Sequence, residues 1–389
     1  MMVSFILILL WVAMYRRLWR NQGDLSIGGI CQEGSFAHTL YMYVNTVLGK
    51  SLQAMEARKL EKLLRQVQSE FGFQIRSWNL VKHIADSSLV ARIIAKDGKS
   101  YMLKSLFIPA ERQRFIVESE RRLAQEGVKL ARPISTLSKH PFILYNETPY
   151  VLYEWIKGKT GQLRDRSDLV ALTQVMARLH RRSVRVVYPD DIMPYEHVRW
   201  EKEYRDRIDS LKSWAQSHQT PSSPQESMIQ RYLPFFEHVA EVALEQLLAS
   251  DYDNYMNGQV AAKCLIHGDF HQKNLIKHKG QWVLIDFEDV RYDFPSKDLL
   301  RLYSMYTRFH PFDTKTFNSM METYFRHHPL PAGAKRLMLT DFLFPHIVER
   351  TLRKQVYASM KTEMLKHWLK QEKRKAMYVS LILSHKQWH

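Results

Sequence analysis

The window CLIHGDFHQKNLIKHKGQWVLIDFEDVRYDFPSKD, residues 264–298, concentrates side chains whose types and spacing suit catalysis. Asp269 and Asn274 precede one short apolar run, and Asp286 follows the next. Carboxylate and amide oxygens are the hard ligands that Mg²⁺ accepts. Phosphoryl transfer from ATP needs a metal to bridge the phosphates and a carboxylate to take the proton of the attacking hydroxyl. The three residues therefore fit metal-dependent phosphoryl transfer.

A β-hairpin is predicted to bring these three side chains together. The apolar runs 275–277 and 281–285 flank a turn at residues 278–280, which contains a glycine. Because a hairpin places the outer ends of its strands side by side, the polar residues just outside the two runs should converge on one point.

The same window leaves two alternatives open. His267, Asp269 and His271 have a spacing that a zinc site could use, although the adjacent hairpin and Asp286 favour the magnesium interpretation. Asp286 could also be no more than a cap at the end of a strand.

Lys104 is the candidate for holding the α- and β-phosphates of ATP. It lies in the middle of a predicted strand, residues 100–108, and a helix predicted at about 110–126 could supply a glutamate partner. Residues 88–95 form another predicted strand, joined to the first by a hairpin turn over residues 96–99. Alternation along the strand does not separate its two faces, so a solvent-facing Lys104 remains an alternative.

The first half of the chain is predicted to form a small, mostly antiparallel sheet. An apolar stripe predicts a helix that starts near residue 56 and ends at Gly72. The runs 141–146 and 150–156 add two strands, so residues 73–156 form a sheet into which one helix is inserted.

From residue 157 onward the pattern is mostly helical. Residues 168–180 form an amphipathic helix with Ser167 as its predicted N-cap, and residues 232–250 form another. The polar stretch 217–227, with two prolines, is predicted to be a mobile loop. Residues 213–262 carry six acidic side chains and one basic side chain, which we interpret as a solvated helix face.

The segments HGDFHQKN (267–274) and IDFE (285–288) resemble the catalytic and metal-binding signature of the aminoglycoside phosphotransferase and choline kinase group. These enzymes are small-molecule relatives of the protein kinases. A looser resemblance covers residues 58–385. The opening LEKLLRQVQSEFGFQIRSWNLVKHI, the hinge-like YVLYEWIKGK and the helix end ARLHRRS are similar to the spore-coat kinase-like branch of endospore-forming bacteria.

This resemblance implies an α+β, bilobal protein-kinase-like fold. A small antiparallel-sheet N-lobe with one helix would cover residues 56–152, and a larger, mostly helical C-lobe would cover residues 153–389. ATP would lie in the cleft near residues 152–156. Residues 1–22 would be an apolar N-terminal segment, and residues 23–55 a linker.

The resemblance also implies the residue roles. Asp269 would be the catalytic base, Lys104 the phosphate lysine, and Asn274 and Asp286 the Mg²⁺ ligands. Asp298 would be a structural carboxylate that braces the catalytic loop. The cofactor-binding residues include a helix glutamate that pairs with Lys104; counting back from the glycine after the helix favours Glu118, with Glu120 as the second choice.

The loop that should cover the phosphates lacks the glycines of a typical kinase phosphate-binding loop. Residues 82–92, KHIADSSLVAR, contain no glycine, although glycines let the backbone approach phosphates closely. Ser87 and Ser88 could serve instead, as small polar residues often do in this group.

We expect an ATP- and Mg²⁺-dependent phosphotransferase acting on a hydroxyl acceptor, associated with the spore coat. The alternative is a weak or inactive pseudokinase with a structural role in coat assembly.

Composition and charge limit the partners. The chain has 389 residues, two cysteines and a net charge of +17, so a disulfide scaffold is excluded and anionic partners are favoured. A polycationic acceptor such as an aminoglycoside is not expected. The acceptor would be a small molecule or a protein hydroxyl, with spore coat proteins as further partners, and no basic–aromatic stripe indicates nucleic acid.

The N-terminus leaves the question of membrane contact open. Residues 1–15 are apolar apart from one serine, and three arginines follow by residue 20. An apolar run of this length, about 22 Å as a helix, is short for a membrane span. We expect a cytoplasmic or spore-coat protein. The alternatives for residues 1–20 are a membrane anchor, an interfacial helix and a start codon assigned too far upstream.

Overall fold

The computed structural model describes residues 60–84, 88–197, 199–261 and 263–385. Two compact units divide the chain, Met1–Val67 and Gln68–His389. The described part of the first unit is helical, and this helix continues to residue 71, with Gly72 at φ +72° ending it as predicted. The predicted segments 1–22 and 23–55 lie outside the described residues. None of the described helices is long and apolar enough to cross a membrane.

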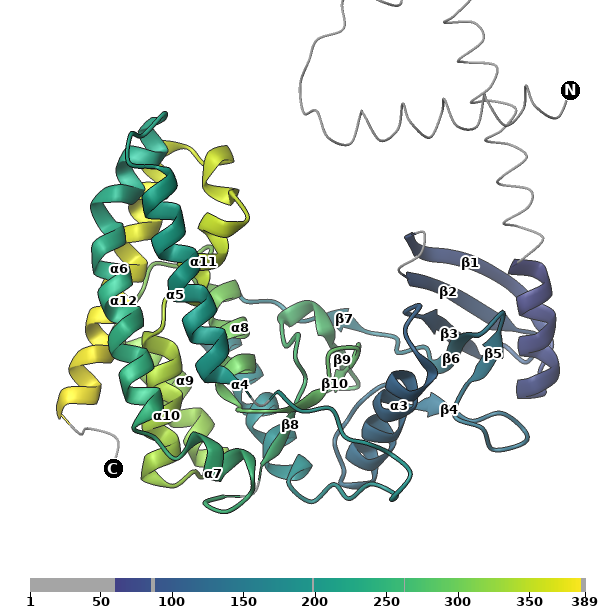
Figure 1. Cartoon of the computed structure of the whole chain (residues 1–389). Coiled ribbons are helices and arrows are strands. Elements are labelled where there is room, and N and C mark those ends of the chain that lie inside the picture. The colour runs from purple at the N-terminus through teal and green to yellow at the C-terminus, as the bar shows by residue number, and fades with distance from the viewer. Residues whose placement is uncertain (1–59, 85–87, 198, 262, 386–389) are drawn as a thin grey trace, which may run out of the picture. The chain divides into compact units, whose positions relative to one another are not determined.

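An antiparallel sheet forms the first part of the second unit (Figure 1). Its strands are β1 (Ile75–Ile84), β2 (Ser88–Ala95), β3 (Ser100–Ser105), β4 (Pro133–Ile134), β5 (Ile143–Tyr145) and β6 (Thr148–Glu154). Their order is β1-β2-β3-β6-β4, with β5 paired to β6. Helix α3 (Ala110–Gln125) packs against β4 and β6. The predicted turn between β2 and β3 is confirmed, because the Ala95 amide donates to the Lys99 carbonyl at 2.9 Å.

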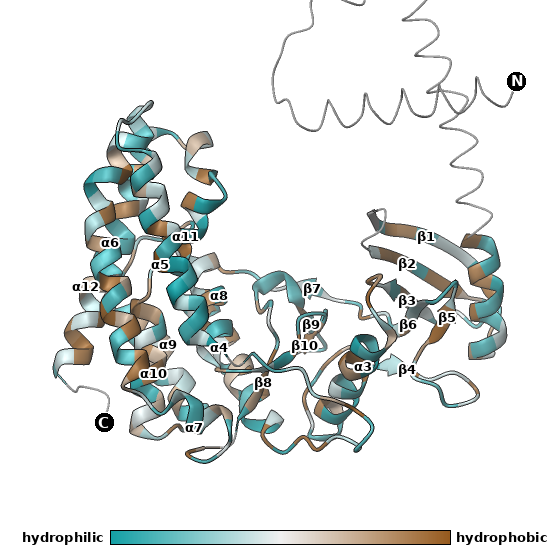
Figure 2. Ribbon diagram, in the orientation of Figure 1, coloured by the Kyte–Doolittle hydropathy of each residue, from teal (hydrophilic) through white to brown (hydrophobic). Residues whose placement is uncertain are grey.

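Helices dominate the rest of this unit, which confirms the predicted α+β class. They are α4 (Arg166–Ser183), α5 (Trp200–Ser217), α6 (Pro224–Leu248), α7 (Tyr252–Met256), α8 (Ser296–Thr307), α9 (Thr314–His327), α10 (Ala332–Leu343), α11 (His346–Arg353) and α12 (Thr362–His385). Helix α4 packs on α8 and α9, while α6 packs on α5, α10 and α12. Figure 2 shows hydrophobic residues alternating with hydrophilic ones along α6 and α12, as amphipathic packing requires.

Short strands between α7 and α8 carry most of the window 264–298. They are β8 (Cys264–Ile266), β9 (Leu275–His278), β10 (Gln281–Leu284) and β11 (Arg291–Asp293), with the 3₁₀ turn η1 (Gln272–Asn274) before β9. Strands β9 and β10 pair antiparallel around Lys279 and Gly280, so the predicted hairpin is confirmed. Strand β8 pairs with β11, and β9 also pairs with β7 (Lys159–Thr160).

Two helix starts differ from the prediction. The N-cap of α4 is Asp165 rather than Ser167, because the Asp165 carboxylate accepts from the Asp168 amide at 3.0 Å. Helix α6 begins at Pro224, eight residues before the predicted start, with Ser223 as N-cap. Proline is well tolerated at a first helical position, since its missing N–H would have no partner there. The second proline of the predicted loop, Pro224, thus marks a helix start.

Candidate active site

The loop after β8 requires glycine at one position. Gly268 has a φ of +83°, a conformation that L side chains rarely adopt. A Cβ atom here would overlap with the backbone carbonyl of Asp289. The loop therefore approaches the segment after β10 so closely that only glycine fits.

Replacing Gly268 with alanine should destabilise the protein more than replacing Gly98. Both glycines have positive φ, +83° and +84°, so both substitutions carry a conformational cost of about 1–2 kcal/mol. A Cβ at Gly98 would meet open space, and only Gly268→Ala adds the overlap with Asp289. Thermal unfolding of the two full-length variants measures the difference. Equal losses of stability would contradict the close approach.

Asp298 holds the backbone of this loop, as expected for a bracing carboxylate. Its Oδ2 accepts from the His267 amide at 2.7 Å and its Oδ1 from the Gly268 amide at 2.9 Å. The side chain is fully buried, and His180 Nε2 lies 3.1 Å from Oδ2. Burial opposes ionisation of Asp298, but the hydrogen bond from His180 outweighs it and keeps the pKa below the usual value.

The candidate base Asp269 has a partner on each carboxylate oxygen. Arg301 Nε donates to Oδ1 at 2.8 Å, and His271 Nε2 lies 3.3 Å from Oδ2. Partial burial raises the pKa of Asp269, but the hydrogen bond from His271 and the charge of Arg301 hold it at about 2. Asp269 is therefore an oriented carboxylate at neutral pH. Sequence reasoning missed Arg301, whose signal was its position one helical turn after Asp298 on α8.

Asn274 and Asp286 are drawn together by the backbone of the hairpin. The Ile285 amide donates to the Asn274 carbonyl at 3.0 Å, and Asn274 Nδ2 donates to the Asp269 carbonyl at 3.1 Å. Asp286 has a φ of +69°, a strained conformation of the kind found at functional sites.

The donor set fits Mg²⁺ rather than zinc. Because the Nδ2 group of Asn274 is engaged, a metal would take its amide oxygen together with a carboxylate oxygen of Asp286. Mg²⁺ commonly takes one or two protein oxygens and completes its shell with phosphate and water. In the part of the chain that the structure describes, no three His, Cys, Asp or Glu residues cluster in a way that could hold a metal ion.

Lys104 points into the site from the sheet. Its side chain is only 12% exposed, and Nζ pairs with Asp286 Oδ1 and, at 3.2 Å, with Glu288 Oε2. Burial alone would lower the pKa of this ammonium group, but the two carboxylates raise it. Lys104 is therefore a charged lysine in the site, and the solvent-facing alternative is wrong.

The preferred helix glutamate, Glu118, does not reach this lysine. Its Oε1 accepts instead from Arg122 Nε at 2.6 Å, one turn further along α3. Glu120, the second choice, is buried, accepts from Tyr153 at 3.0 Å and lines a pocket with Lys104. Two residues correspond to about 200° around a helix, so the two glutamates face opposite ways. Burial raises the pKa of Glu120 to about 8, against the opposing hydrogen bond from Tyr153.

Of the two serines predicted to contact phosphate, only Ser88 can be followed, because Ser87 lies outside the described residues. Ser88 begins β2 and pairs with Ile84 across the hairpin. Its hydroxyl is buried and has no hydrogen-bond partner among the residues that the structure describes. A buried, unpaired hydroxyl is the kind of group that a ligand oxygen would satisfy. Ser88 therefore stays a candidate.

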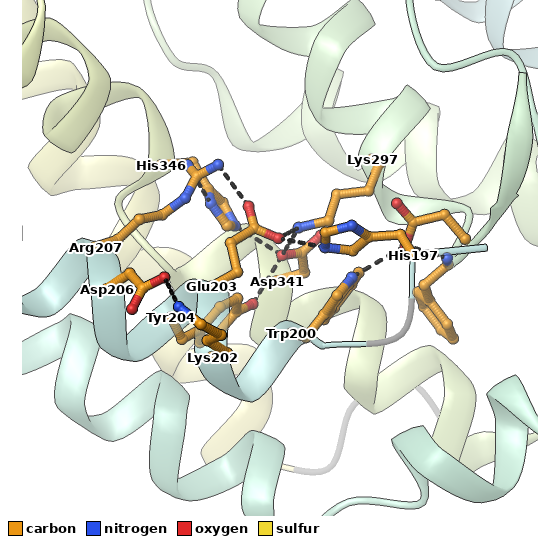
Figure 3. A network of polar contacts seen from close by, with 12 residues as sticks. His197, Trp200, Lys202, Glu203, Tyr204, Asp206, Arg207, Lys297, Asp341 and His346 are labelled. Atoms are coloured by element: carbon orange, nitrogen blue, oxygen red, sulfur yellow. Dashed lines mark hydrogen bonds and ion pairs between the residues drawn. The ribbon is translucent and has the colours of Figure 1, made fainter. Parts of the chain in front are cut away.

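A buried polar network fixes the start of α8, the helix that carries Asp298 and Arg301 (Figure 3). Lys297 Nζ lies 3.4 Å from Glu203, 3.5 Å from Asp341 and 4.0 Å from the centre of the Trp200 ring. Asp341 also accepts from Tyr204 at 2.7 Å. The network thereby ties α8 to α5 and α10 and holds the helix behind the catalytic loop.

His346 completes this network as a neutral ring. Arg207 can only donate, so Nδ1 of His346 accepts from it at 3.0 Å, and Nε2–H donates to Asp341 at 2.7 Å. Burial lowers the pKa of His346 to about 4, and Asp341 only partly opposes this.

We expect the free energy of unfolding to fall between pH 6.5 and about pH 4. In this window the unfolded chain protonates His346 and the folded chain does not, so acid favours unfolding. Urea unfolding at several pH values measures the slope. His346→Gln should flatten it, whereas His238→Gln, at an exposed position on α6, should not. A slope that is the same in all three proteins would contradict the neutral His346.

A family model matches the chain, and so does a curated relative. The model described as "Phosphotransferase enzyme family" matches residues 81–334. Spore coat protein S of Bacillus subtilis (strain 168) is 23% identical over 261 residues, which cover 65% of this chain and 73% of that protein.

Solved structures share the fold. An aminoglycoside phosphotransferase from Alicyclobacillus acidocaldarius aligns with a TM-score of 0.63 at 18% identity, over 82% of this chain and 93% of that one. An amicoumacin kinase in complex with AMP-PNP aligns with a TM-score of 0.55 at 16% identity, over 86% and 96%. The predicted kinase-like fold is thus confirmed. Because the family model spans more than half of the chain, the protein belongs to the phosphotransferase enzyme family.

Proposed function

We propose that the protein transfers the γ-phosphoryl group of ATP to a hydroxyl acceptor in a Mg²⁺-dependent reaction. One observation carries this proposal, the clustering of four residues of the required types. The Asn274 side chain donates to the Asp269 carbonyl, and the Asn274 carbonyl accepts from the Ile285 amide, next to Asp286. Lys104 pairs with Asp286. Phosphoryl transfer needs little beyond such positioning and charge.

Each residue has a defined task in this reaction. Asp269 orients the acceptor hydroxyl and takes its proton as the acceptor oxygen bonds to the γ-phosphorus and the bond to the ADP oxygen breaks. Asp286 and Asn274 would hold Mg²⁺, which would neutralise charge on the phosphates. Lys104 would pair with the α- and β-phosphates. The nucleotide would bind near the end of β6, where Tyr153 and Lys104 line one pocket.

In a loose transition state, Asp269 would act chiefly by orienting the hydroxyl. A carboxylate with a pKa of about 2 is a weak base in the resting enzyme. In a metaphosphate-like transition state the hydroxyl proton leaves late, so orientation matters more than basicity. Arg301 and His271 hold the carboxylate for this purpose.

A second candidate is a pseudokinase with a structural role in a spore coat. The glycine-free connection between β1 and β2 and the likeness to spore coat protein S favour it. Coat or cytoplasmic location fits either candidate, since an active kinase can also be packed into a coat.

Phosphate transfer by the full chain distinguishes the two candidates. The protein is incubated with radiolabelled ATP and a panel of hydroxyl compounds, with water as one acceptor, in Mg²⁺ or in chelator. We expect ADP formation that requires Mg²⁺ and increases with at least one acceptor. Nucleotide binding without ADP formation from any acceptor would contradict the enzyme and support the pseudokinase.

A further inference from the structure

The segment that follows Asp286 has few hydrogen bonds of its own. Asp286 has a φ of +69°, and the side chains of Asp286 and Glu288 both pair with Lys104. Within the segment, the Val290 amide donates to the Phe287 carbonyl at 3.0 Å. In the proposed reaction Lys104 would pair with the phosphates instead. Its contacts therefore cannot be what orients Asp286 while the nucleotide is bound.

Arg112, in the first turn of α3, contacts this segment from a distant part of the chain. Its Nη2 donates to the Glu288 carbonyl at 2.9 Å, although the two residues are 176 positions apart. In the part of the chain that the structure describes, no other group donates to this carbonyl. Because the carbonyl lies two residues after Asp286, the hydrogen bond restrains the strained turn that aims the Asp286 carboxylate.

Two aromatic rings hold the guanidinium group of Arg112 in place. Its Cζ atom lies 4.4 Å from the centre of the Tyr195 ring and 5.4 Å from the centre of the Phe115 ring. The Tyr195 carbonyl accepts from the Tyr292 amide at 2.8 Å, so Tyr195 is tied to β11. A planar guanidinium stacks on aromatic faces, which limits the orientations that it can take. The hydrogen bond to Glu288 is thus made by a side chain that is already oriented.

Arg112 is a charged donor in a partly buried place. Burial lowers the pKa of its guanidinium group, but an arginine stays charged at neutral pH. A hydrogen bond from a charged donor is about twice as strong as a neutral one. Nη1 of Arg112 is buried and has no hydrogen-bond partner among the described residues. The bond from Nη2 to Glu288 is therefore the polar contact that sets the position of this side chain.

The catalytic loop restrains the neighbours of Glu288 on each side. A Cβ atom at Gly268 would lie 2.3 Å from the Asp289 carbonyl, and the centres of the Phe287 and His267 rings are 4.6 Å apart. These contacts fix the residues before and after Glu288 against the catalytic loop. The hydrogen bond from α3 fixes the residue between them.

We propose that Arg112 is a positioning residue for the metal site, which acts through the Glu288 carbonyl and holds Asp286 in the orientation that binds Mg²⁺ with the nucleotide. This inference rests on the proposed function, and it adds a residue of α3 that belongs to neither of the two motifs that indicated the site. Helix α3 also carries Glu120, which lines the pocket with Lys104. One helix therefore contacts both the pocket and the segment after Asp286.

Binding of Mn²⁺ and AMP-PNP to the full chain tests this inference without turnover. Mn²⁺ replaces Mg²⁺ because electron paramagnetic resonance measures the free ion. We expect Arg112→Met to raise the Mn²⁺ concentration for half-maximal binding about tenfold, and to leave the amount of AMP-PNP bound at saturating Mn²⁺ unchanged. Arg112→Lys keeps a charged donor and should recover part of the loss. Arg114→Met removes an exposed arginine that pairs with Asp191 and should change nothing.

The outcomes separate this inference from the proposed function. If the original protein binds Mn²⁺ with AMP-PNP and Arg112→Met has the same affinity, Arg112 has no positioning role and the proposed function stands. A loss of AMP-PNP binding that persists at saturating Mn²⁺ would show a general disturbance and would also overturn the inference. If the original protein binds no Mn²⁺ with AMP-PNP, the proposed function fails and the inference fails with it.

Hydrogen exchange tests the contact itself, without any ligand. The amides of residues 287–290 should exchange faster in Arg112→Met than in the original protein, because the segment loses its hydrogen bond to α3. Arg114→Met should exchange as the original protein does. Equal exchange in all three proteins would contradict the restraint by Arg112.

Discussion

Replacing Asp269 with asparagine should lower the rate of phosphoryl transfer by about 10²–10⁴-fold. Asparagine keeps the shape of the side chain and, through its amide oxygen, the contact with Arg301, but its amide nitrogen cannot accept from His271 and the side chain cannot take the hydroxyl proton. Affinity for ATP should stay within about twofold of the original, because Asp269 contacts no group assigned to the nucleotide. Steady-state ADP formation measures the first effect, and calorimetric titration with ATP and Mg²⁺ measures the second.

An exposed aspartate provides the control. Asp190→Asn removes one negative charge from the surface and should leave both quantities unchanged. Full activity in Asp269→Asn would contradict the assignment of Asp269 as the base. A loss of nucleotide affinity equal to the loss of rate would show instead that the substitution disturbs the metal site.

Replacing Asp286 with asparagine should remove the Mg²⁺ dependence of nucleotide binding and lower activity by about 10³-fold. A bridging metal supplies several kcal/mol of charge stabilisation in the transition state. Asparagine tolerates the positive φ of +69° better than other residues, so this variant separates loss of the carboxylate from backbone strain. ADP formation and ATP affinity at several Mg²⁺ concentrations provide the measurement.

A neighbouring carboxylate serves as the comparison. Glu288 also pairs with Lys104, at 3.2 Å, but is not assigned to the metal. Glu288→Gln should therefore keep the Mg²⁺ dependence that Asp286→Asn loses. If both variants respond to Mg²⁺ as the original protein does, Asp286 is not a metal ligand.

The sequence predicted the core of the site because its geometry is local. Apolar runs on each side of Lys279 and Gly280 leave little choice but a hairpin, and the hairpin places Asn274 beside Asp286. Lys104 was found in the same way, from its place inside a strand. The strands around it were also predicted, since β2 coincides with residues 88–95.

The contacts that were missed depend on packing between distant segments. Arg301 meets Asp269 because α8 crosses behind the catalytic loop, which no local pattern specifies. Glu120 rather than Glu118 faces the pocket because of how α3 is rotated against the sheet. Sequence spacing alone could locate none of these.

Thermal unfolding of the full chain, with and without ATP and with Mg²⁺ or chelator, tests the central claim of a metal-bridged nucleotide site most directly. At about 100 times its dissociation constant, a ligand stabilises the folded state by about 2.7 kcal/mol, which raises the unfolding temperature by a few degrees for a chain of this size. We predict such a rise only when ATP and Mg²⁺ are both present. In Asp286→Asn we predict no rise. No rise at millimolar ATP with Mg²⁺, or an equal rise in chelator, would contradict it.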